Sequence, residues 1–119
     1  MEKSTPKMTD CIFCKIVNQE IPAKILYEND SFIAINDLNP VAPIHILLIS
    51  KKHYENILES APSEGADLIN AVKSLQESTK TESKNGHRLV MNSGDNGGQT
   101  VMHFHAHFLA GRKISWPPG

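Results

Sequence analysis

Three histidines stand at alternate positions near the end of this 119-residue chain: His103, His105 and His107. Residues at i, i+2 and i+4 of a β-strand share one face, so a strand here would bring the three imidazoles together. Imidazole can be a nucleophile, a general acid or base, or a metal ligand near neutral pH. The run therefore has three interpretations: a solvated strand face, a metal site like the three-histidine zinc sites, and a nucleophile that attacks phosphorus. In the third, we expect His105, with a histidine on either side, to form the covalent intermediate.

A glycine-rich segment, Gly97-Gly98-Gln99-Thr100, lies just before the histidines. Glycines let backbone N–H groups approach an anion closely, and the Thr100 hydroxyl can donate a hydrogen bond to a phosphate oxygen or a leaving group. Asn92, at the end of the preceding predicted strand, is a second polar candidate. A Gly-Gly pair alone equally fits a tight hairpin turn. Next to three histidines, it favours a phosphate site.

Two cysteines, Cys11 and Cys14, have the spacing of a zinc half-site or a redox pair, and two unligated thiols would fit as well. A thioredoxin-like redox motif follows a strand, and we expect none before Cys11. A zinc site needs two more ligands, for which the chain offers the triple run and three isolated histidines, His45, His53 and His87. Two cysteines are too few for a disulfide scaffold, so we expect a reducing, cytoplasmic location.

A carboxylate, Asp37, ends a predicted apolar strand and shares a face with Ile35. The simpler interpretation is an ordinary acidic residue at the end of a strand. The functional interpretation is an acceptor for ribose hydroxyl groups, beside an apolar slot for a base.

These residues need a scaffold, and the chain predicts one of strands and helices. We expect a short helix over 11–19, a hairpin of strands at 24–28 and 31–37, and further strands at 45–50, 87–92 and 100–111. A long helix, capped by Ser60 or Ser63 and stopped by Asn85-Gly86, is expected between the third and fourth strands. This order predicts an α+β fold with a five-stranded, mostly antiparallel sheet.

The length fits one domain, which we assign to 11–119, with 1–10 as a flexible polar tail. The formal net charge of −1 gives no reason to expect nucleic acid as a partner. No apolar run is long enough to cross a bilayer, and the N-terminus lacks the apolar core of a secretory signal. We therefore expect neither nucleic acid nor a membrane as a partner.

The run from His103 to Leu109 resembles the signature of the histidine-triad family, His-φ-His-φ-His-φ-φ with φ apolar. The similarity to the Hint branch of that family extends to Cys11–Ile16, Glu20–Lys24, Pro40–His45, Lys51–His53, Gly97–Gln99 and Trp116–Gly119. The resemblance implies the histidine-triad fold, a five-stranded sheet with one long and one short helix. It also implies a homodimer in which the sheet continues across both subunits and Trp116 reaches toward the partner's site.

The same resemblance implies an enzyme that binds purine nucleoside monophosphates. The Hint branch resembles a phosphoramidase that cleaves P–N bonds of adenosine or guanosine phosphoramidates, or the related bond of aminoacyl adenylates. Carried over by position, the catalytic residues would be His45, Thr100, the nucleophile His105, and His107. The nucleotide would be contacted by Ile12, Phe13, Ile16, Ile35, Asp37, Leu38, Asn92, Gly98, Thr100, Val101, His105 and His107.

Family members with the cysteine pair resemble zinc binders, and their ligands correspond to Cys11, Cys14, His53 and His103. The implied zinc is structural, with no metal in the chemical step. Two positions depart from the family pattern: Thr100 stands where many Hint proteins have Ser, and Ile35 stands where an aromatic residue often lines the base slot. Three alternatives stay open: a nucleotide-binding regulatory module, a dinucleoside polyphosphate hydrolase or nucleotidyl transferase, and a zinc hydrolase that uses the triple histidine as ligands.

Overall fold

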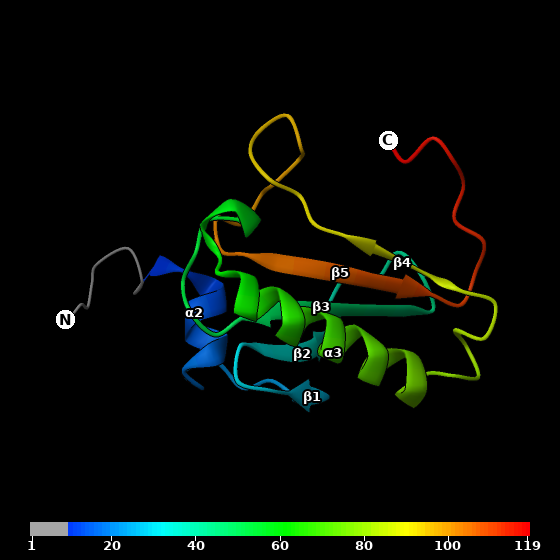
Figure 1. Cartoon of the computed structure of the whole chain (residues 1–119), viewed down its shortest axis with the longest axis horizontal. Coiled ribbons are helices and arrows are strands. Elements are labelled where there is room, and N and C mark those ends of the chain that lie inside the picture. Colours follow the sequence, from blue (N-terminus) through cyan, green and yellow to red (C-terminus); the bar gives the residue numbers. More distant parts are fainter. Residues whose placement is uncertain (1–9) are drawn as a thin grey trace.

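A computed structural model describes residues 10–119, so all of the predicted tail except Asp10 lies outside the described residues. Figure 1 shows one sheet with a long helix across one face. The elements are α2 (Ile12–Val17), β1 (Tyr27–Glu28), β2 (Phe32–Asn36), β3 (Ile44–Ser50), the 3₁₀ helix η1 (Ile57–Glu59), α3 (Pro62–Ser78), β4 (His87–Val90) and β5 (His105–Ala110).

The five strands form one sheet in the order β1-β2-β3-β5-β4, and every neighbouring pair is antiparallel. The predicted α+β class and the five-stranded sheet are therefore confirmed. The first strand is much shorter than predicted, since only Tyr27 and Glu28 pair with β2. Among the described residues, none of the helices is long and apolar enough to span a bilayer.

The larger core lies between the sheet and α3. One stripe of this helix, Leu68, Ala71 and Leu75, is buried against apolar side chains of the strands. The strand side of this core includes Phe32, Leu48 and Phe108, all almost completely buried, along with Ala34, Ile46, Phe104, Ala106 and Ala110. No histidine belongs to this cluster, so this face gives the sheet stability rather than chemistry.

Both predicted ends of α3 are wrong. Its N-cap is Ala61 rather than Ser60 or Ser63, and the free N–H of Ala61 is satisfied by the Glu64 carboxylate at 2.7 Å. The helix ends at Ser78 rather than at Asn85-Gly86, because the next turn folds around a buried hydroxyl. Ser83 is fully buried and its Oγ donates to the Thr79 carbonyl at 2.8 Å. The chain leaves the helix axis before the predicted stop.

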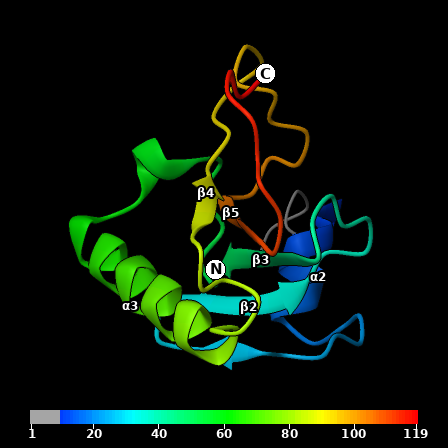
Figure 2. The same ribbon diagram turned by 90° about the vertical axis from the view of Figure 1, so that its right-hand side faces the viewer.

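A smaller apolar cluster covers the opposite face, where the short helix α2 packs. Figure 2 shows α2 and α3 on opposite sides of the sheet. Phe13 of α2 contacts β2 and β3 side chains in this cluster, which consists of Ile33, Ile35, Leu47 and Ile49. Cys11 is the N-cap residue of α2, and its sulfur accepts the Cys14 N–H at 3.4 Å. This face also carries the histidines.

The fifth strand begins at His105, not at Thr100 as predicted. The preceding residue, Phe104, bonds to the segment after β3, with its N–H on the Tyr54 carbonyl at 2.6 Å. The side chain of Gln99 also donates to the Val101 carbonyl at 3.0 Å, which bends the chain before the strand. As a result only His105 and His107 lie in the strand, and His103 sits in the irregular segment leading into it.

Candidate active site

Strand register brings a fourth histidine to the triad. In the antiparallel pair β3–β5, His45 lies opposite Leu109 and Leu47 lies opposite His107. His45 and His107 are therefore diagonal neighbours on the α2 side of the sheet. Their ring nitrogens, Nε2 of His45 and Nδ1 of His107, are 2.9 Å apart. His105 completes the group, with its ring centroid 5.1 Å from that of His107.

The ring of His105 is oriented by the backbone beside it. Its Nδ1 lies 2.7 Å from the His103 carbonyl oxygen, which can only accept a hydrogen bond. In the neutral ring the proton is therefore on Nδ1, and Nε2 has a free lone pair. Phe13 packs edge-on against the His105 ring at 5.0 Å between centroids, and only 7% of His105 is exposed. A fixed tautomer with a free Nε2 is what a nucleophilic imidazole needs.

The pair of His45 and His107 is partly shielded from solvent. Burial lowers the pKa of His107 below its ordinary value, and the neighbouring rings of His105 and His45 lower it further. Asp37 opposes this shift, and its Oδ2 lies 3.3 Å from Nε2 of His45. The structure thus brings the predicted carboxylate at the end of β2 to the histidine group.

A second cluster gathers the two cysteines with His53 and His103. The Cys11 sulfur is 3.2 Å from Nδ1 of His103, and the Cys14 sulfur is 3.1 Å from Nδ1 of His53. The four possible ligand atoms all lie within 4.8 Å of one another. Burial, together with the hydrogen bond to Cys11, raises the pKa of the Cys14 thiol to about 12. Two thiols and two imidazoles in this arrangement could hold a metal ion.

The donor set fits zinc, because structural zinc sites use such pairs of cysteine and histidine. The Nε2–H of His103 donates to the Ser50 carbonyl at 2.7 Å, which leaves Nδ1 as a lone pair facing the sulfurs. Burial lowers the pKa of His103 to about 4, so this ring is neutral near pH 7. Its second nitrogen is thus held ready as a ligand.

These contacts exclude one interpretation of the triple run. A solvated strand face is wrong, because His103 and His105 are buried. The three rings also do not point their nitrogens at one centre: His103 faces the sulfurs, His105 faces a carbonyl, and His107 faces His45. Among the described residues, the two groups with converging ligand atoms are Cys11, Cys14, His53 and His103, and Asp37, His45 and His107.

The glycine-rich loop is held in place by a residue that the sequence argument did not single out. The side chain of Gln99 is buried, accepts the Gly94 N–H at 2.9 Å and donates to backbone carbonyls of Glu55 and Val101. Gly98 has φ +83°, a conformation that side chains disfavour, and the next hydroxyl residue, Thr100, is exposed. A glutamine beside a Gly-Gly pair was the available signal for this anchor.

The comparisons with known proteins agree with this geometry. A family model described as the HIT domain matches residues 18–114. The chain belongs to the HIT family. An uncharacterised HIT-like protein of Synechococcus elongatus is 44% identical over 111 residues, which cover 92% of this chain and 97% of that protein.

Solved structures agree as well. A HIT family hydrolase from Legionella pneumophila is 41% identical with a TM-score of 0.81, over 92% of this chain and 99% of that one. A hypothetical histidine triad nucleotide-binding protein from Sulfolobus tokodaii is 38% identical with a TM-score of 0.78, over 90% of this chain and 72% of that one. The expected histidine-triad family and fold are therefore confirmed.

The predicted nucleotide contacts of this HIT protein divide into two groups. Phe13 and Ile35 are buried in the cluster under α2, and Ile16 and Val101 pack against it. The other apolar candidates point outward, since Ile12 is 51% exposed and Leu38 is 95% exposed. Asn92 lies just after β4 and is partly buried, and Trp116 in the C-terminal segment is 79% exposed.

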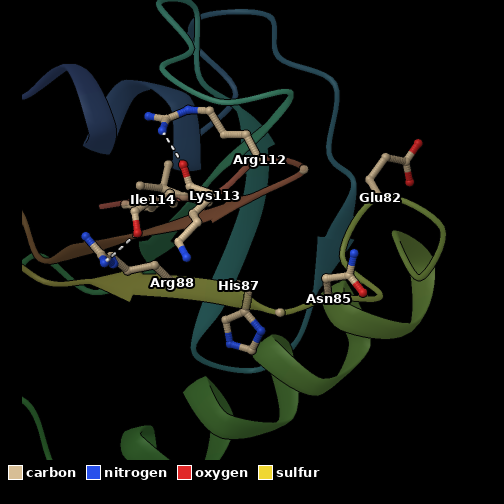
Figure 3. A pocket seen from close by; sticks show the side chains of 10 residues that line it. Glu82, Asn85, His87, Arg88, Arg112, Lys113 and Ile114 are labelled. Carbon is tan, nitrogen blue, oxygen red and sulfur yellow. Dashed lines mark hydrogen bonds between the residues drawn. The ribbon is translucent and has the colours of Figure 1, made fainter. Parts of the chain in front are cut away.

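A cavity of about 550 Å³ lies away from the histidine group, where β4 meets the C-terminal segment (Figure 3). Arg88 donates to the carbonyls of Ile114 and Ser115, and Arg112 donates to that of Lys113, so two arginines hold the HIT chain's C-terminal segment in place. The predicted site residues all lie outside this cavity, which is lined by Glu82, Asn85, Gly86, His87, Arg88, Leu109, Gly111, Arg112, Lys113 and Ile114.

Proposed function

We propose that this HIT protein is a purine nucleotide-binding hydrolase that cleaves the P–N bond of nucleoside phosphoramidates, or the related P–O anhydride bond of aminoacyl adenylates, through a nucleotidyl-histidine intermediate on His105. One observation carries the proposal: the His103 carbonyl, 2.7 Å from Nδ1 of His105, leaves Nε2 as the lone pair. The Hint-like motifs around the triad support the phosphoramidate substrate. The names of the two solved neighbours, a hydrolase and a nucleotide-binding protein, support the general class.

The proposed reaction has two displacements at phosphorus. The Nε2 lone pair of His105 forms an N–P bond while the P–N bond of the substrate breaks, and its electron pair leaves with the amine nitrogen. Water then attacks phosphorus, and the bond to His105 breaks with its electrons returning to Nε2. Over both steps one water is consumed, so that its oxygen ends on phosphorus and one proton ends on the amine. His107, diagonal to His45, would donate a hydrogen bond to the phosphate or the leaving group.

The nucleotide would lie on the α2 side of the sheet. We assign the ribose hydroxyls to Asp37, which closes β2 next to His45. The base would contact the apolar group around Phe13 and Ile35, at the edge of the same cluster. The remaining contacts that we propose are the phosphate contacts of Asn92, Gly98 and Thr100 and the apolar contacts of Ile12, Ile16, Leu38 and Val101.

Two further assignments complete the proposal. Zinc held by Cys11, Cys14, His53 and His103 would be structural. A homodimer would extend the sheet along β4, which pairs only with β5 among the described strands and so has an unpaired edge. In such a dimer the exposed Trp116 would reach toward the partner's site.

The deciding experiment removes the nucleophile. We expect His105→Ala to abolish hydrolysis of an adenosine phosphoramidate while AMP or GMP still binds, because the fold and the nucleotide contacts remain. Rapid quenching of the wild-type reaction should yield protein whose mass has grown by one nucleotidyl group. His87→Gln is the matched control, since His87 is an exposed histidine of β4 outside the site. Near-normal turnover by His105→Ala would refute the mechanism.

The substrate class needs its own comparison. Kinetics with adenosine phosphoramidate, aminoacyl-AMP and dinucleoside polyphosphates on one preparation would separate the phosphoramidase from a dinucleoside polyphosphate hydrolase. We expect the highest kcat/KM with the P–N substrates. Nucleotide binding without turnover of any of the three would instead favour a regulatory module.

A further inference from the structure

His45 is held between two partners that restrict where its proton can be. Its buried ring accepts the backbone N–H of Val41 at Nδ1, with 3.1 Å between the nitrogens. On the other side, Nε2 lies 2.9 Å from Nδ1 of His107 and 3.3 Å from Oδ2 of Asp37. Both nitrogens of one imidazole are therefore engaged at the same time.

The Val41 amide determines which nitrogen of His45 carries the proton. A backbone N–H can only donate, so Nδ1 of His45 must offer its lone pair. In the neutral ring the proton is then on Nε2, from which it is shared with His107 and Asp37. Nδ1 of His107 must accept, and the single proton of a neutral His107 is placed on Nε2. A backbone group thus sets the tautomers of two side chains in series.

The loop that supplies the amide is itself held from the end of β5. Arg112 donates from Nε to the Val41 carbonyl at 3.0 Å. Both backbone groups of Val41 are therefore hydrogen-bonded, its N–H to His45 and its C=O to Arg112. Close packing fixes the two segments together, because a Cβ on Gly111 would come within 2.8 Å of Pro43 Cβ. The Val41 side chain contributes little, being 58% exposed.

We propose that Val41 and Arg112 are positioning residues that set the tautomer of His45 and, through it, keep His107 as a neutral Nε2–H donor. The tautomer itself does not depend on the reaction. Its consequence for turnover rests on the proposed function, in which His107 donates to the phosphate or the leaving group. Without the Val41 amide, His45 and His107 could exchange donor and acceptor roles, and His107 would present a lone pair in place of a proton.

The same three side chains could also be taken for a metal site. The ligand atoms of Asp37, His45 and His107 lie within 4.8 Å of one another. A metal on Nε2 of a neutral His45 would require the proton on Nδ1. That N–H would then face the N–H of Val41, and two donors cannot form a hydrogen bond. The amide therefore favours a hydrogen-bonded pair over a metal ligand set.

The test is nitrogen NMR of the histidine rings, which separates protonated from unprotonated ring nitrogens without substrate. Wild-type protein should show His45 and His107 both as Nε2–H tautomers. Val41→Pro removes the donor, so we expect a mixture of tautomers at His45. Val41→Ala keeps the amide and should preserve the wild-type signals. His45 or His107 found as Nδ1–H in the wild type, or an unchanged pattern in Val41→Pro, would overturn the proposal.

A second pair of variants tests Arg112 and covers the case in which Val41→Pro does not fold. Arg112→Met should move the His45 signals in the same direction as the loss of the amide. Arg88→Met is the matched control, because Arg88 also bonds to backbone carbonyls, but to those of Ile114 and Ser115. Equal spectra for Arg112→Met and Arg88→Met would remove Arg112 from the assignment.

Turnover adds a readout that depends on the proposed function. In Val41→Pro we expect kcat for an adenosine phosphoramidate to fall roughly tenfold with KM changed by less than about twofold, since the lost hydrogen bond serves the reacting state. Wild-type protein that has the expected tautomers but no hydrolytic activity would refute the function and leave this inference standing. A tenfold loss without a change of tautomer would refute the inference alone.

Discussion

Four histidines, His45, His103, His105 and His107, differ in which ring nitrogen donates and which accepts, because each has different neighbours. His103 gives its Nε2–H to the Ser50 carbonyl and turns Nδ1 toward the cysteines, while His105 gives Nδ1–H to the His103 carbonyl. His107 meets His45. Each partner is a carbonyl, an amide or a ring in fixed position, so the roles are fixed before any substrate arrives. The candidate nucleophile, His105, is distinguished by a tautomer that leaves Nε2 as a lone pair.

At this scale the pKa of His107 leads to a pH prediction. Since burial lowers its pKa below 6.5, the unfolded chain takes up this proton first as the pH falls. The contribution of neutral His107 to the free energy of unfolding is complete above pH 6.5 and is lost as the pH drops through the lowered pKa. We expect the wild type to lose more stability than His107→Gln between about pH 7.5 and about pH 5.5, measured by urea unfolding. Equal losses would show that His107 is not responsible.

Among the elements, the loop before β5 is irregular but constrained. It runs from the end of β4 to His105 and includes both the candidate phosphate glycines and their buried anchor, Gln99. A Cβ on Gly97 would come within 2.5 Å of the Ser93 carbonyl oxygen, so a side chain there forces the loop to move. The backbone conformation of the loop near the histidines is therefore tightly restricted.

A single methyl group tests that constraint. We expect Gly97→Ala to destabilise the protein by about 1–3 kcal/mol and to lower turnover about tenfold or more, because the loop is displaced from the reacting groups. Gly65→Ala is the matched control: Gly65 is exposed in α3 with free space around it, and alanine there should add about 0.5–1 kcal/mol. The measurements are urea unfolding and steady-state kinetics. Normal activity in Gly97→Ala would mean that the loop does not contact substrate.

The same scale shows which elements could be predicted. Alternating or continuous apolar runs predicted β2, β3 and β5, and helical spacing predicted α3, because a buried face requires apolar residues at regular intervals in the sequence. The ends were wrong where a polar side chain bonds to backbone carbonyls and redirects the chain, as Ser83 does after α3 and Gln99 does before β5. The 3₁₀ helix η1, capped by the Asn56 side chain, was not predicted either.

The candidate site follows the same rule. The triad, the cysteine pair and Asp37 were found because their side chains can do chemistry. Val41 and Arg112 were missed, since the group that matters at Val41 is an amide that almost every residue has. Their part depends on the fold bringing the Pro40–Pro43 loop onto His45, which no local pattern reports.

For the whole molecule, the cysteine–histidine cluster ties together segments far apart in the chain. Cys11 and Cys14 belong to the start of α2, His53 follows β3, and His103 precedes β5. The carbonyl of His103, one of the proposed zinc ligands, also orients His105. The zinc cluster would therefore be linked to the candidate nucleophile through this one residue. A metal here would support the site without taking part in the chemical step.

Zinc removal should therefore affect stability first. We expect elemental analysis to find zinc in the purified protein, and a chelator to lower Tm by about 10 °C or more, because binding energy at such a site is folding energy. Cys14→Ser should lower Tm similarly with or without chelator. Purified protein that is well folded and contains no zinc would remove this assignment. Turnover that is lost at once on chelation, at a temperature where the fold persists, would favour a zinc hydrolase.

Metal binding should also release a proton. Burial holds the pKa of Cys14 at about 12, so at neutral pH the free thiol is protonated, whereas zinc binds the thiolate. We expect at least one proton per zinc, detected by calorimetry in two buffers of different ionisation enthalpy. A binding enthalpy that is independent of the buffer would contradict this prediction.

The registers of β2, β3 and β5 all join residues of equal parity. Even-numbered side chains of these strands, such as Leu48 and Phe108, pack under α3, whereas odd-numbered ones, such as His45 and His107, lie on the α2 side. Mutations at even positions would therefore act on stability, whereas odd positions combine the smaller apolar cluster with the histidines, so mutations there would act on stability and on chemistry. A one-residue insertion directly after His105 would exchange the two sets downstream of it, so that Ala106 takes the place of His107 and the His107 ring turns toward the core under α3.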